Sequence, residues 1–257
     1  MMKQIVIPNN GKNIAGVLHP ASRPQGKTLI ISHGFRGTKD GGGRAVALAE
    51  AVAAIGFNVI RYDFTPLQNL SCQIAELTAV VSHVRQSAEE VFLLGRSMGG
   101  SASLAAAADQ AVNGLILWST PWDLAATFRQ ALGVHYERLT AGETVSLTDN
   151  YGRLMLTPDF IQDFRRYDLL GAVSSLRHVP LLILQGSADS LVAVSQAQAI
   201  YSAAPGPVRL IIFPAGDHHL TDHAQEAGNT IIAWLEQLTL DCTRQSHGPE
   251  YGQNKSG

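Results

Sequence analysis

The sequence places one serine in a setting suited to nucleophilic chemistry. Ser97 lies within Gly95-Arg96-Ser97-Met98-Gly99, after the apolar run 91–94 and before an alanine-rich stretch at 101–108. A serine hydroxyl attacks a carbonyl carbon when a base takes its proton, and a sharp strand-to-helix turn exposes it to that base. The flanking glycines permit such a turn because they have no β-carbon. We therefore predict that Ser97 is a nucleophile and that the Met98 N–H faces a developing oxyanion.

The pentapeptide alone is a weak signal, because a G-x-S-x-G pattern arises by chance about once in ten chains of this length. The competing interpretation is a glycine-rich connection that carries a surface serine. A serine nucleophile also needs a histidine within hydrogen-bond reach and a carboxylate that orients this histidine. The rest of the chain must supply both residues.

Both partners follow short apolar runs late in the chain. Asp189 comes just after the run 181–185, and His218 and His219 come just after the run 208–213. The candidates thus appear in the order serine, aspartate, histidine, each at the expected end of a strand.

Short apolar runs predict a sheet of eight strands, and helical stretches separate most of them. The expected strands are 4–7, 14–18, 28–32, 58–61, 91–94, 114–118, 181–185 and 208–213. The expected helices are 44–55, 71–87, 98–108, 195–204 and 229–240.

The later strands are continuous apolar runs that alternate with helices from residue 28 onward. This order predicts an α/β fold with a mostly parallel sheet covered by helices on both faces. Asn9-Asn10-Gly11 predicts an antiparallel hairpin at the start. Ligands of such sheets bind beyond the carboxyl ends of the strands, where Ser97 falls.

About sixty residues, 119–179, separate two strands that a single helix could have joined. We interpret this interval as a cap insertion with helices at 122–132 and 158–170. Residues 143–148 and 153–157 predict a small hairpin around Asp149-Asn150-Tyr151-Gly152. The aromatic residues of the cap insertion either line an acyl or aryl pocket or hold the cap on the sheet. They are Trp122, Phe128, Tyr136, Tyr151, Phe160 and Phe164.

The 257 residues, 46% hydrophobic and 16% charged, predict one domain over 1–242 and a polar, disordered tail over 243–257. A net charge of −2 gives no support for nucleic-acid binding. No apolar run is long enough to cross a membrane. Cys72 and Cys242 are expected to be free thiols, and with no export signal at the start we expect a cytoplasmic protein.

Five ordered motifs between residues 14 and 240 give the chain a family resemblance. They are His33-Gly34-Phe35-Arg36-Gly37, Arg61-Tyr62-Asp63-Phe64, the turn at Ser97, the Asp189 loop and Asp217-His218. The chain resembles α/β-hydrolases of the serine-hydrolase group that includes cinnamoyl or feruloyl esterases and monoacylglycerol-lipase-like (serine aminopeptidase S33-type) enzymes. It departs from them at 65–70, where they usually carry a Gly-x-Gly turn, so we expect a different pocket entrance.

The resemblance implies a catalytic triad of nucleophile Ser97, acid Asp189 and base His218. It also implies an oxyanion hole from the N–H groups of Phe35 and Met98. His218 is preferred over His219 because the base of these enzymes directly follows an aspartate. The implied substrate is a small-molecule carboxylic ester, with no metal or organic cofactor, and a homodimer is one possible assembly.

Several alternatives stay open on the sequence. A thioesterase, an aminopeptidase and a non-catalytic ligand-binding protein share the expected fold. His219 and His223 have the spacing of a zinc pair but lack a third ligand. Gly41-Gly42-Gly43 is not followed by the lysine and hydroxyl residue of a phosphate loop. Weaker candidates for the acid, each suited to a solvated or capping role, are Asp63, Asp123, Asp163 and Asp168.

Overall fold

The computed structural model describes residues 1–66, 69–149 and 152–246, and its centre is an eight-stranded sheet. The strand order is β1-β2-β4-β3-β5-β6-β9-β10. In this sheet β2 is antiparallel to both of its neighbours, β1 and β4, and all other neighbouring strands are parallel, so the mostly parallel sheet is confirmed. The bounds are β1 Lys3–Asn9, β2 Lys12–His19, β3 Lys27–Ser32, β4 Asn58–Tyr62, β5 Glu90–Arg96, β6 Gly114–Trp118, β9 Leu181–Gly186 and β10 Val208–Phe213.

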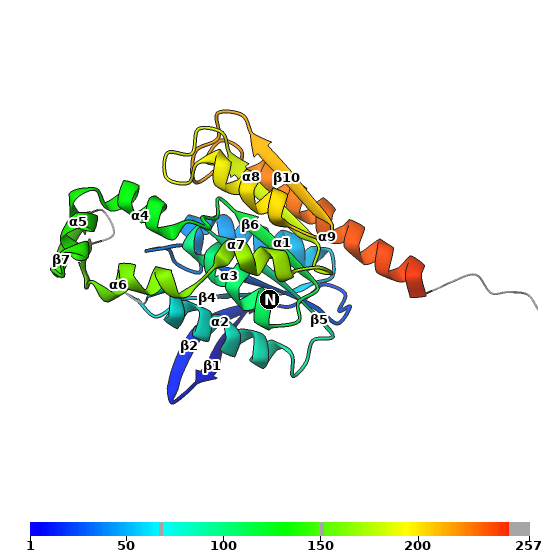
Figure 1. Cartoon of the computed structure of the whole chain (residues 1–257). Helices are drawn as coiled ribbons and strands as arrows, with labels where there is room; N and C mark the ends of the chain where they lie inside the picture. Colours follow the sequence, from blue (N-terminus) through cyan, green and yellow to red (C-terminus); the bar gives the residue numbers. More distant parts are fainter. Residues whose placement is uncertain (67–68, 150–151, 247–257) are drawn as a thin grey trace, which may run out of the picture.

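Helices cover both faces of this sheet, because its central strands are apolar on both sides (Figure 1). Every residue of β3, β6 and β9 is buried. Ile31 and Leu94 share one core with the helices α1 (Arg44–Ala54) and α9 (Ala224–Ser246). The opposite core includes α2 (Leu70–Val84), α3 (Met98–Asp109) and α8 (Val194–Ala203).

The expected helices are present, with ends that shift by a few residues. The largest shift is in α9, which begins at Ala224 and continues to Ser246. Helix α9 thus includes 243–246, the first residues of the expected polar tail. The remainder of that tail, 247–257, lies outside the described residues. Across the described ranges, no helix is long and apolar enough to span a bilayer.

The segment 119–179 forms a separate group of short elements between β6 and β9. Figure 1 shows α4, α5, β7 and α6 standing out to one side of the sheet. Strands β7 and β8 pair antiparallel as predicted, although residues 150–151 of the expected turn are outside the described part. The bounds are α4 Leu124–Leu132, α5 Val134–Thr140, β7 Val145–Asp149, β8 Gly152–Leu156, α6 Asp159–Gln162, η2 Asp163–Arg166 and α7 Leu169–Ser175.

The prediction of a single helix over 158–170 is wrong, because the helical conformation is interrupted at Tyr167. Tyr167 has the extended angles φ −124° and ψ 117°. The next helix, α7, starts where Asp168 accepts the Gly171 N–H at 2.9 Å, as an N-cap does.

Candidate active site

Ser97 occupies a strained turn between β5 and α3. Its φ of 52° and ψ of −128° are rarely adopted by a residue with a side chain. The turn is tight on both sides: a β-carbon on Gly95 would lie 2.4 Å from the Gly99 oxygen, and one on Gly99 would lie 2.2 Å from the His33 oxygen. Glycine is therefore required at both positions, and the turn lifts Ser97 out of the end of the sheet.

The structure brings Asp189, His218 and Ser97 together. Their loops follow β9, β10 and β5, whose parallel directions put all three carboxyl ends at one edge of the sheet. His218 Nδ1 lies 2.8 Å from Asp189 Oδ2, and His218 Nε2 lies 3.1 Å from Ser97 Oγ. Because a carboxylate only accepts, Nδ1 carries the ring proton and Nε2 is left to accept the Ser97 hydroxyl proton.

The side chain of Asp189 is fully buried and accepts hydrogen bonds from several donors. Its Oδ1 accepts the N–H groups of Leu191 and Val192, each at 2.9 Å, and its Oδ2 accepts from Gln185 Nε2 at 2.9 Å. Burial acts to raise the pKa of Asp189, but the hydrogen bond and charge of His218 together with the two N–H groups outweigh it and lower that pKa. Asp189 is thus ionised at neutral pH and suited to orient His218.

The loop after β3 lies directly against the nucleophile turn. The ring of His33 fixes this loop: Nε2 accepts the Phe64 N–H at 3.0 Å, and Nδ1 donates to the Gly34 oxygen at 2.8 Å. Burial lowers the pKa of His33, which agrees with a neutral ring. Phe35 comes next in this loop, and Met98 is the first residue of α3.

The weaker acid candidates serve other partners. Asp63 accepts from Lys39 through both its N–H, at 2.6 Å, and its Nζ, at 2.8 Å. Asp163 accepts from Ser71, and Asp123 and Asp168 cap α4 and α7. Asp123 and Asp168 thus have the capping role expected for them. Asp163 is instead buried against Ser71, and Asp63 pairs with Lys39, so a solvated or capping role is wrong for these two.

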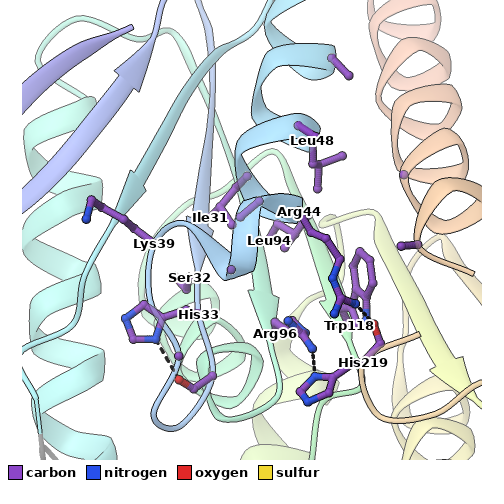
Figure 2. A pocket seen from close by; sticks show the side chains of 18 of the residues that line it. Ile31, Ser32, His33, Lys39, Arg44, Leu48, Leu94, Arg96, Trp118 and His219 are labelled. Carbon is purple, nitrogen blue, oxygen red and sulfur yellow. Dashed lines mark hydrogen bonds between the residues drawn. The ribbon is translucent and has the colours of Figure 1, made fainter. Parts of the chain in front are cut away.

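His219 contacts Arg96, as Figure 2 shows, and its ring centroid lies 5.4 Å from that of His218. Burial lowers its pKa, and the positive charge of Arg96 and the neighbouring His218 lower it further. His223 instead contacts Glu226 and the Pro214 oxygen, so the two histidines do not form a pair. Within the described ranges no group of three metal-ligating side chains occurs.

A cavity of about 660 Å³ opens onto Ser97 and His218. The loop of Phe35 forms one wall, and residues of 119–179 form the other. Phe128 lines this cavity and also packs edge-on against Phe35, with ring centroids 5.2 Å apart. The rings of Phe160 and Phe164 pack against Phe128 and complete an aromatic cluster. Phe128 thus both lines the cavity and packs against other aromatic rings. Sequence reasoning missed His135 and Leu147 in this lining, because no sequence pattern marks them.

Known structures with the same architecture are found, although no family model and no curated protein sequence matches the chain. Est1E from Butyrivibrio proteoclasticus superimposes with a TM-score of 0.80 at 20% identity, covering 92% of this chain and 99% of Est1E. The esterase domain of a Rhodothermus marinus protein gives 0.72 at 22% identity, with coverages of 92% and 98%. The α/β-hydrolase GrgF from Penicillium sp. sh18 gives 0.74 at 17% identity, with coverages of 93% and 97%.

The chain has the α/β-hydrolase fold. The fold expected from the five motifs is therefore confirmed, and the α/β-hydrolase sheet explains why three loops far apart in the sequence meet at one edge.

Proposed function

We propose that this protein is a serine esterase that hydrolyses small to medium carboxylic esters. The observation that carries the proposal is His218, which touches Ser97 on one side and buried Asp189 on the other, beside a cavity large enough for a small ligand. The similarity to esterases supports it. Est1E has also been solved with bound ferulic acid, which is consistent with an aryl or acyl group in the cavity of this chain.

In the first step Ser97 attacks the ester carbonyl carbon. His218 Nε2 takes the hydroxyl proton as the bond from Oγ to carbon forms, and the carbonyl electron pair moves onto oxygen. The N–H groups of Phe35 and Met98 stabilise this oxyanion. The intermediate collapses when the bond to the alcohol oxygen breaks, and His218 gives its proton to the departing alcohol.

In the second step water repeats the attack on the acyl-enzyme. His218 takes a proton from water, the new bond to the acyl carbon forms, and the bond to Ser97 Oγ breaks. The proton then returns to Ser97, and the carboxylic acid leaves. Throughout, ionised Asp189 stabilises the cationic form of His218.

The cavity lining favours an ester over a peptide with a free amino terminus. An aminopeptidase needs a carboxylate that binds the substrate ammonium group, and the described lining of this cavity contains no Asp or Glu. A thioester reacts through the same steps, so thioesterase activity is the second candidate. The mechanism needs no metal or organic cofactor.

A fluorophosphonate probe with peptide mapping tests the proposal. We expect covalent labelling at Ser97 and none in Ser97→Ala. Absence of labelling in the folded wild-type protein would instead support a non-catalytic ligand-binding protein. A panel of matched esters and thioesters, graded by acyl and alcohol size, then defines the substrate.

A further inference from the structure

A second cavity of about 350 Å³ lies between the sheet and the helices α1 and α9. Its interior is apolar and includes Ile31 and Leu94 from the sheet, Leu48 from α1 and Ile232 from α9. This volume is within the range of small-ligand pockets, about 300–1,000 Å³. The cavity can therefore bury an apolar chain away from water.

One end of this cavity is polar and positively charged. Figure 2 shows Arg44, Arg96, Trp118 and His219 gathered at that end, away from Leu48. Arg44 donates to the His219 oxygen at 3.2 Å, and Arg96 contacts the His219 ring. The described lining contains no Asp or Glu. An anionic group is favoured there by charge complementarity.

An aromatic ring lies beside the positive charge at this end. Trp118 is 8% exposed, and the centroid of its ring is 5.8 Å from the Arg96 guanidinium carbon. The guanidinium groups of Arg44 and Arg96 supply the hydrogen-bond donors. The end of the cavity thus offers donors and positive charge together.

We propose that this cavity binds a medium-chain monocarboxylate, with the alkyl chain among Ile31, Leu48 and Ile232 and the carboxylate at the end formed by Arg44, Arg96 and Trp118. A tail of about six to ten carbons suits the volume. Arg44, Arg96 and His219 are among seven residues that line both this cavity and the one at Ser97, so the two cavities adjoin at the charged end. The site does not depend on the proposed esterase activity.

A substitution at Gly228 distinguishes ligand binding in the second cavity from binding in the cavity at Ser97. It lies in α9 and lines only the second cavity, and a β-carbon there would meet nothing closer than Leu48 Cδ1 at 3.9 Å. Gly228→Phe fills the cavity, and Gly228→Ala is its matched control, because both remove a glycine from a helix interior. Ala51→Leu fills the space from the α1 side if Gly228→Phe lowers the Tm.

Isothermal titration calorimetry with sodium octanoate, sodium hexanoate and 1-octanol tests the site. We expect octanoate to bind about 15-fold more tightly than hexanoate, since two further methylenes are buried. Gly228→Phe should weaken octanoate binding at least tenfold while Gly228→Ala keeps it. Arg44→Gln should weaken octanoate binding and leave 1-octanol unchanged.

Three results would overturn the proposal. One is an absence of octanoate binding to the wild-type protein. Another is equal binding to wild type and to both filled variants, which would place the ligand in the cavity at Ser97. The third is binding of 1-octanol as tight as that of octanoate, which would show that the charged end does not recognise a carboxylate.

Discussion

Gly34 lies directly against Ser97. A β-carbon on Gly34 would stand 2.9 Å from Ser97 Cβ, closer than real β-carbons approach other atoms, and 3.1 Å from the Arg96 oxygen, which is also a tight contact. The loop that carries Phe35 is thus packed on the nucleophile turn with no spare room. The position of the Phe35 N–H depends on this contact.

Gly34→Ala is expected to lower kcat/KM by about 100-fold, because the added methyl must push the Phe35 loop or Ser97 out of place. The effect should fall mainly on kcat, since the displaced groups act on the transition state. Steady-state kinetics on an activated ester measures it, and Gly228→Ala, away from the catalytic cavity, is the control. A normal kcat in Gly34→Ala would show that the loop does not serve the oxyanion.

Ser97→Ala is expected to keep the fold and to lower turnover by ~10⁴-fold or more. The variant removes only the hydroxyl, and alanine is the smallest side chain that tolerates the same turn. Circular dichroism and thermal unfolding check the fold, and ester hydrolysis checks the activity. Unchanged hydrolysis by the folded variant would remove Ser97 from the mechanism.

The sheet was predictable because its signals are local. The central predicted strands are short apolar runs, and burial on both faces of a parallel sheet requires that kind of run. The positions of Ser97, Asp189 and His218 at strand ends followed from the same runs. Their distances did not, because they depend on how β5, β9 and β10 pair.

The secondary structure of the segment 119–179 was harder to predict from the sequence, because short helices carry weak periodic signals. Helix α5 is separated from α4 only by Gly133, whose φ is 52°, and the start of α7 depends on the cap at Asp168. A glycine such as Gly133 is a local signal for the end of a helix, and an aspartate such as Asp168 is one for its start. The cavity beneath Arg96 and His219 has no sequence signal at all, since it is the space that two helices leave over a sheet.

Asp189→Asn is expected to lower the free energy of unfolding by less at low pH than at pH 7. The folded state lowers the pKa of Asp189, so ionised Asp189 stabilises the fold above its ordinary pKa of about 3.9, and this stabilisation is lost as pH falls through the lower folded value. Asparagine does not titrate. Chemical denaturation of both proteins from pH 7 to 3 should show their difference in the free energy of unfolding shrinking below about pH 4. A difference that stays constant over this range would contradict the linkage.

Asp163→Ala is expected to lower the free energy of unfolding by about 1.5–3 kcal/mol. Asp163 is 5% exposed and accepts both the N–H and the hydroxyl of Ser71, at 2.7 and 2.6 Å, which ties η2 to the start of α2. The variant leaves the Ser71 N–H without its acceptor. Ser71→Ala removes only the hydroxyl, together with its contact to Tyr167, and should cost less. Denaturant titrations of both variants measure the difference, and a larger loss in Ser71→Ala would show that the hydroxyl contacts dominate.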